Sequence, residues 1–168
     1  MTALLLLNFI TMGQDVNRLE FSERTNSMIL IGPCNRDAFA MPEFQEWFDT
    51  NYENYNPKPS IIDDLKSLSL ENVSLKIVLG TWCSDSKLQV PEFYRIMDEI
   101  GFPDDQVTLL MVNRDKKIPE LDIEDLTIER VPTFIFYKTG SDRSKKEIGR
   151  IIETPKRSLE EDLLDILH

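Results

Sequence analysis

The feature that most constrains the fold is an apolar run that ends just before a cysteine, at the point where a helical pattern begins. The run covers residues 75–79, and Trp82 and Cys83 follow it closely. Over Ser84–Ile100 apolar residues recur at helical spacing, with Pro91 inside the pattern. The sequence therefore predicts a strand that delivers Cys83 to the first turn of a helix, which the proline bends.

This position suits a reactive thiol. The free N–H groups and the dipole of a helix N-terminus stabilise a thiolate, the nucleophilic form of cysteine. Asp85 works against it, since a negative charge at about 6 Å in water costs on the order of 0.7 kcal/mol. Ser86 can donate a hydrogen bond to the thiolate. We therefore expect Cys83 and Ser86 to carry any chemistry of this chain.

The arrangement resembles the active site of the thioredoxin superfamily, in which Trp-Cys-x-x-Cys lies between a central strand and a proline-bent helix. Trp82, Cys83 and Pro91 match that pattern, whereas Ser86 occupies the position of the second cysteine. The two-cysteine cycle of the family is therefore not available within this motif.

A second part of the resemblance lies downstream. Residues 128–134 contain Val131-Pro132-Thr133 and are similar to the family segment whose proline is cis and packs beside the active-site cysteine. Gly149 matches a glycine in the returning hairpin strand. The resemblance covers 75–168 and implies a thioredoxin-like fold, with Trp82, Val131 and Pro132 binding an extended substrate peptide.

The resemblance implies a thiol–disulfide oxidoreductase or isomerase that acts on protein thiols or disulfides through Cys83 alone, with an unidentified reductant and no cofactor. A mixed disulfide formed there needs a second thiol to resolve it. The alternative is a non-catalytic thioredoxin-fold module that binds an extended protein segment. A glutathione-dependent glutaredoxin is disfavoured, because the glycine pair of that family does not follow the strand after Pro132.

Cys34 is the only other cysteine. It follows a predicted strand at 28–31, which we expect to run parallel to the central strands, so that Cys34 emerges on the same edge as Cys83. One intervening strand would separate them by about 10 Å, whereas a disulfide needs Cα atoms within about 7 Å. We expect an ordinary thiol, with a resolving cysteine as the alternative.

The whole pattern predicts one α/β domain over 27–168. We expect a mixed sheet with helices on both faces and an N-terminal strand-helix extension over 28–55. Between Asn113 and Ile128 the chain is charged and contains Pro119, which leaves room for at most a short helix at 121–126. A chain of 168 residues with 41% hydrophobic content is sufficient for one core.

Charge excludes some classes of partner. With 19 Lys and Arg against 30 Asp and Glu, the net charge of −11 repels phosphate backbones and anionic lipid surfaces, so nucleic acid is not an expected partner. Two cysteines and one histidine cannot supply a structural zinc cluster on their own, and we expect no metal.

Residues 1–14 contain an apolar run that is too short to span a bilayer and has no basic region before it. They are interpreted as an export leader or disordered N-terminus, or alternatively as a strand of the fold, with the polar residues 14–26 as a linker. A leader implies an exported or periplasmic protein, where an unpaired cysteine is a working one. The alternative location is cytoplasmic.

Overall fold

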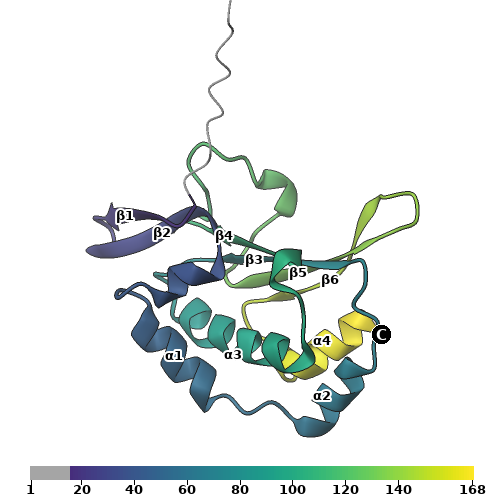
Figure 1. The fold of residues 1–168 in the computed structure, drawn as a ribbon. Helices are drawn as coiled ribbons and strands as arrows, with labels where there is room; N and C mark the ends of the chain where they lie inside the picture. The colour runs from purple at the N-terminus through teal and green to yellow at the C-terminus, as the bar shows by residue number, and fades with distance from the viewer. Residues whose placement is uncertain (1–15) are drawn as a thin grey trace, which may run out of the picture.

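A computed structural model describes residues 16–168, which form a six-stranded mixed sheet (Figure 1). The strands lie in the order β1-β2-β4-β3-β5-β6; β3 and β4 are parallel, and every other pair of neighbours is antiparallel. Their bounds are β1 Arg18–Ser22, β2 Ser27–Cys34, β3 Val73–Leu79, β4 Val107–Met111, β5 Thr133–Thr139 and β6 Lys145–Ile152. The predicted α/β fold is confirmed.

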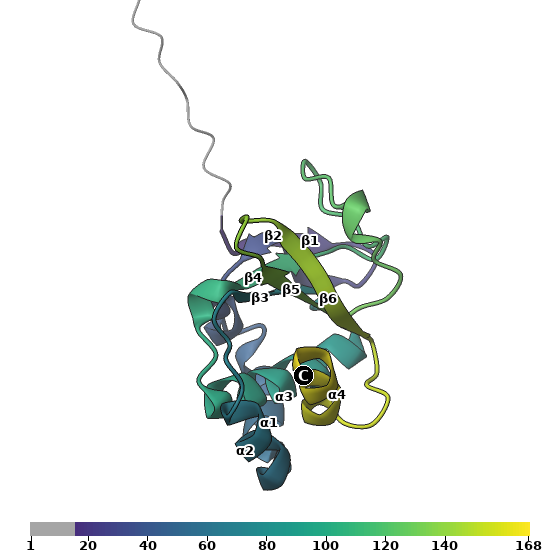
Figure 2. The ribbon, with the colours of Figure 1, turned by 90° about the vertical axis from the view of Figure 1, so that its right-hand side faces the viewer.

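All four α-helices lie on one face of the sheet, as the two views in Figures 1 and 2 show. They are α1 Gln45–Asn54, α2 Pro59–Lys66, α3 Ser84–Ile100 and α4 Leu159–Leu167. The other face is covered by the segment 113–131, whose helical content is the single 3-10 turn η3, Glu124–Leu126. The prediction of helices on both faces is therefore met on the second face only by this short 3-10 turn. A longer helix does not form there because charged residues and Pro119 interrupt the apolar period that a helix needs.

The helix-covered face holds the larger core, and its aromatic side chains are central to it. Phe93 of α3 packs on Phe134 of β5, with ring centroids 4.4 Å apart, and neither side chain is exposed. Helix α1 contributes to this core through Phe48, whose ring stacks on that of Phe39 with centroids 4.5 Å apart. Burial of these faces is what holds α1 and α3 on the sheet.

The predicted long helix is confirmed. It runs over Ser84–Ile100 with Pro91 in its interior, and Gly101 ends it in the left-handed conformation, with φ at 69°. Glycine adopts this conformation without a steric cost, so it stops the helix cleanly.

The N-terminal part differs from the prediction. Residues 18–22 of the predicted linker form β1, which pairs antiparallel with β2, so the sheet begins before residue 27. The apolar strand predicted at 28–31 continues to Cys34. The linker prediction is wrong here because β1 is an edge strand whose side chains are mostly half-buried, which leaves a weak apolar signal. Residues 1–14, interpreted as a leader, lie outside the described residues.

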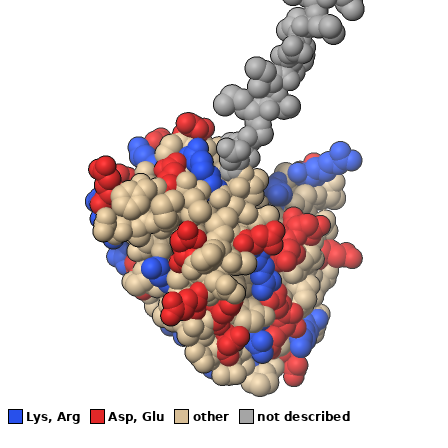
Figure 3. Space-filling model, turned by 60° about the vertical axis from the view of Figure 1, so that its left-hand side comes forward, with Lys and Arg blue, Asp and Glu red and all other residues tan. Residues whose placement is uncertain are grey.

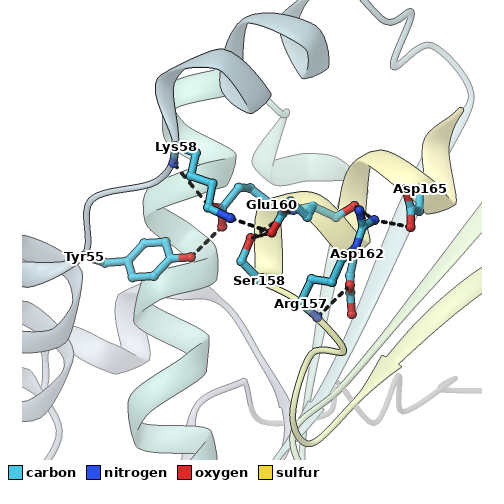
Figure 4. Close-up of polar contacts among 8 residues, drawn as sticks. Tyr55, Lys58, Arg157, Ser158, Glu160, Asp162 and Asp165 are labelled. Carbon is cyan, nitrogen blue, oxygen red and sulfur yellow. Dashed lines mark hydrogen bonds and ion pairs between the residues drawn. The ribbon is translucent and has the colours of Figure 1, made fainter.

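A buried carboxylate joins the start of α4 to the connection between α1 and α2 (Figure 4). Glu160, in the first turn of α4, accepts hydrogen bonds from the Tyr55 hydroxyl at 2.6 Å and the Lys58 backbone N–H at 3.2 Å. Ser158 caps the same helix by accepting from the Glu161 N–H, as the sequence predicts. The connection between α1 and α2 is thus fastened to the start of α4.

Acidic and basic side chains are interspersed with uncharged ones on the face seen in Figure 3. This is the arrangement of a solvated acidic surface and not of a single charged block. None of the helices within residues 16–168 combines the length and apolarity needed to cross a bilayer.

Candidate functional site

Cys83 is the N-cap residue of α3, with extended backbone angles of −94° and 128°. Its N–H donates to the Gly80 carbonyl at 2.9 Å, and its own carbonyl accepts from the Lys87 N–H at 3.0 Å. This tight turn places the thiol beside the free N–H groups of the first helical turn. The residue is partly buried.

The Cys83 sulfur has two acceptors within reach. It lies 3.3 Å from the Val131 carbonyl oxygen and 3.9 Å from a carboxylate oxygen of Asp85. The peptide bond between Val131 and Pro132 is cis, as the resemblance implies. The fold therefore brings together Cys83 and the segment before β5, which are 48 residues apart in the chain. The side chains of Val131 and Pro132 are buried, so their backbone is what faces the thiol.

Trp82 is fixed beside the thiol on the face without helices. Its indole Nε1 donates to the Val112 carbonyl at 2.8 Å, at the end of β4. The guanidinium of Arg114 lies over its ring, 5.1 Å from the centroid. This arrangement places an exposed positive charge near Cys83. Sequence reasoning missed Arg114, because no local pattern links it to Trp82.

Ser86 does not act as expected. The residue is fully buried, and its hydroxyl oxygen accepts a hydrogen bond from the Gly80 N–H at 3.4 Å. Among the hydrogen bonds of residues 16–168, the thiol of Cys83 is joined to Val131 and Asp85 and not to Ser86. Ser86 therefore holds the turn before α3 and supports Cys83 indirectly.

Cys34 lies far from this site. Strand β2 runs antiparallel to β4, and Cys34 pairs with Leu109, so it leaves the sheet at the end opposite to Cys83. It packs against the core of the helix-covered face, whereas Cys83 packs against the other face. Burial raises the pKa of the Cys34 thiol to about 11. The expectation that the strand before Cys34 runs parallel to the central strands is wrong. Cys34 is therefore not placed to resolve a disulfide at Cys83.

A cavity of about 520 Å³ lies within the segment 113–131. Its lining includes Ile128 and Glu129, which come just before Val131. The sequence did not predict this cavity, because its residues indicate only a charged loop. Within the described part of the chain no three metal-ligating side chains lie close enough together to hold an ion.

Comparisons with known proteins identify the fold alone. A crystal structure of a protein of unknown function from Pseudomonas aeruginosa has a TM-score of 0.56 and 14% identity, covering 82% of this chain and 90% of that one. An HIV epitope-scaffold has a TM-score of 0.51 and 15% identity, covering 82% and 83%. No protein-family model matches the sequence, and no curated protein matches it.

Proposed function

We propose that this protein is a thioredoxin-like thiol–disulfide oxidoreductase or isomerase that acts on proteins through the single thiol of Cys83. The observation that carries the proposal is the partly buried cysteine at the start of α3, whose sulfur lies 3.3 Å from the Val131 carbonyl oxygen. Helix N-termini favour the thiolate that such chemistry requires.

The chemistry begins with attack of the Cys83 thiolate on a disulfide. A bond forms between Cys83 and one substrate sulfur, the substrate disulfide breaks, and the second sulfur leaves as a thiolate that takes up a proton. A thiol from outside the chain then attacks the mixed disulfide and releases Cys83. The serine at position 86 and the position of Cys34 support this monothiol cycle, because Ser86 has no sulfur and Cys34 leaves the sheet away from Cys83.

Reaction with a model aromatic disulfide such as dithionitrobenzoate tests the proposal. We expect rapid release of one equivalent of thionitrobenzoate at neutral pH, followed by no turnover until another thiol is added. Cys83→Ser should remove this rapid phase, and Cys34→Ser should leave it unchanged.

Equal, slow reaction of both cysteines would contradict the proposal and leave the binding module as the better interpretation. Rapid release of a second equivalent of thionitrobenzoate without added thiol would contradict the monothiol cycle, because a second thiol of the chain would then have displaced the first. Cys34 is a suitable internal reference, since a thiol of pKa about 11 is only about one part in ten thousand ionised at pH 7.

A further inference from the structure

The cavity in the segment 113–131 has the size and lining of a binding pocket. Its volume of about 520 Å³ lies within the range of about 300–1,000 Å³ that is usual for ligand sites. The apolar part of its lining is formed by Ile118, Leu121, Ile123 and Ile128. Ile118 and Ile123 are also buried in the core of the helix-free face, so this apolar lining is continuous with the sheet packing.

The pocket is held open by the fold. At one end the Asn113 side chain accepts from the N–H groups of Asp115 and Lys117, at 2.9 and 3.0 Å. At the other end Arg150 of β6 donates to the Leu126 carbonyl at 3.0 Å. Thr127 has a φ of 51°, a conformation that a β-branched residue rarely adopts. These contacts preorganise the segment, so binding does not have to order it.

The rim of the pocket is acidic. Its polar lining consists mainly of carboxylates, with two lysines and one threonine among them: Asp115, Lys116, Lys117, Glu120, Asp122, Glu124, Thr127 and Glu129. Part of this charge is already compensated, because Glu120 pairs with Arg18, Asp115 with Arg24 and Glu124 with Lys117. Glu129 is exposed at the end nearest to Val131. A cationic group entering the pocket therefore meets a favourable potential.

The pocket and the thiol lie on the same face of the sheet. Leu121 and Ile128 pack against the same core of the helix-free face as Trp82 and Cys83. Glu129 lies two residues before Val131, whose carbonyl contacts the Cys83 sulfur. The residues that flank a cysteine disulfide-bonded to Cys83 therefore lie on the face that carries the pocket.

We propose that the pocket binds the residues flanking the reactive cysteine of the protein substrate and that it selects a sequence combining a large apolar residue with lysine or arginine. The apolar side chain contacts the isoleucine and leucine lining, and the basic group meets the acidic rim. This inference rests on the proposed function and specifies its substrate class.

Three short peptides test it, each with one cysteine carried as a 2-thiopyridyl disulfide. The cysteine is flanked by leucine and lysine, by leucine and glutamate, or by serine and lysine. Attack by Cys83 forms the peptide disulfide and releases pyridine-2-thiolate, which takes up a proton and is followed by absorbance. We expect the leucine–lysine peptide to react about tenfold faster than the other two.

Two variants test whether the preference for the leucine–lysine peptide comes from the pocket. Leu121→Trp fills the cavity and should abolish the preference for leucine. The double variant Glu124→Lys, Glu129→Lys keeps the apolar lining and should reduce the preference for lysine to about threefold or less. Its matched control is Glu43→Lys, Glu71→Lys, which makes the same charge change at exposed positions outside the cavity. The control should retain the preference.

A separate binding experiment distinguishes an error in the proposed pocket from an error in the proposed disulfide chemistry. Fluorescently labelled peptides in which serine replaces the cysteine are titrated with the protein, and anisotropy reports their affinity. If the leucine–lysine peptide binds more tightly than the other two but no disulfide reaction occurs, the pocket is upheld and the proposed function is rejected. Equal rates and affinities for all peptides would overturn the pocket alone. A faster acidic peptide would also overturn it and would identify Arg114 as the selecting charge.

Discussion

The two faces of the sheet differ in how they are covered and in what they carry. The helix-covered face buries all the aromatic residues of the two core clusters, among them Phe93, Phe134 and Phe136. The core of the other face is aliphatic and lies beneath a segment with one helical turn. Cys83, Trp82 and the cavity all belong to this second face. One face therefore holds most of the buried apolar contacts, and the other carries the proposed site.

The largest expected effect is on the helix-covered face. Phe93→Ala removes a fully buried ring from contact with Phe134 and should lower the free energy of unfolding by about 3–5 kcal/mol. Urea denaturation measures it, and Phe93→Leu, which keeps most of the apolar volume, should cost less than about 1.5 kcal/mol. Equal losses in both variants would contradict this account, because they would show that the apolar volume retained by leucine contributes nothing.

The corresponding change on the other face should cost less. Leu126→Ala removes a buried side chain from η3, but the segment can relax toward the neighbouring cavity, so we expect about 2–3 kcal/mol. The same urea experiment, with an unchanged dependence on denaturant, measures this loss. A loss as large as that of Phe93→Ala would remove the contrast between the faces.

The next largest loss of stability is expected from substitution of Glu160 in the helical layer. Glu160→Ala leaves the Tyr55 hydroxyl and the Lys58 N–H without their acceptor and should cost about 2 kcal/mol at neutral pH. Glu160→Gln keeps one acceptor oxygen and should cost less. If both variants match wild type, these hydrogen bonds contribute nothing to stability.

The pH dependence of this contribution has a definite sign. Burial raises the pKa of Glu160, but the hydrogen bonds from Tyr55, from the helix N-terminus and from Lys58 outweigh it and lower the pKa. Its contribution is therefore present above the ordinary carboxyl pKa and is lost as the pH falls through the lower pKa of the folded state. The difference between wild type and Glu160→Gln should shrink over that range.

The smallest effect has the opposite sign. Burial and then the charge of Glu160 raise the pKa of Glu92 on α3, so its ionised form destabilises the fold. Glu92→Gln should stabilise the protein at neutral pH by less than about 1 kcal/mol, since the group is partly solvated. The gain should vanish as the pH falls from the raised pKa to the ordinary one, because wild-type Glu92 then becomes protonated. Destabilisation by Glu92→Gln would contradict this account.

The sequence predicted those features that local pattern determines. The helix over Ser84–Ile100 follows from its apolar period, and the capped start of α4 follows from Ser158 and Glu161. Features that depend on distant partners were not predicted. The antiparallel direction of β2 is set by its pairing with β1 and β4, which no local pattern specifies.

The candidate site shows the same division. Cys83 and Trp82 were identified from adjacent residues, and the proximity of the segment around Pro132 to Cys83 came from the resemblance. The burial of Ser86 and the stacking of Arg114 on Trp82 depend on how turns from separate parts of the chain meet. The cavity arises where a charged segment spans the aliphatic core without filling the space, and residue types alone do not reveal an unfilled volume.

The buried carboxylate of α4 also has a consequence for the rates of folding and unfolding. Glu160 joins residues that are 105 and 102 positions away in the chain, so its contacts close very long loops. We expect contacts of this kind to form after the transition state, because closing a long loop costs entropy before its contacts are gained. Loss of Glu160 should therefore speed unfolding and leave the folding rate nearly unchanged, which makes this residue a determinant of how long the native state persists.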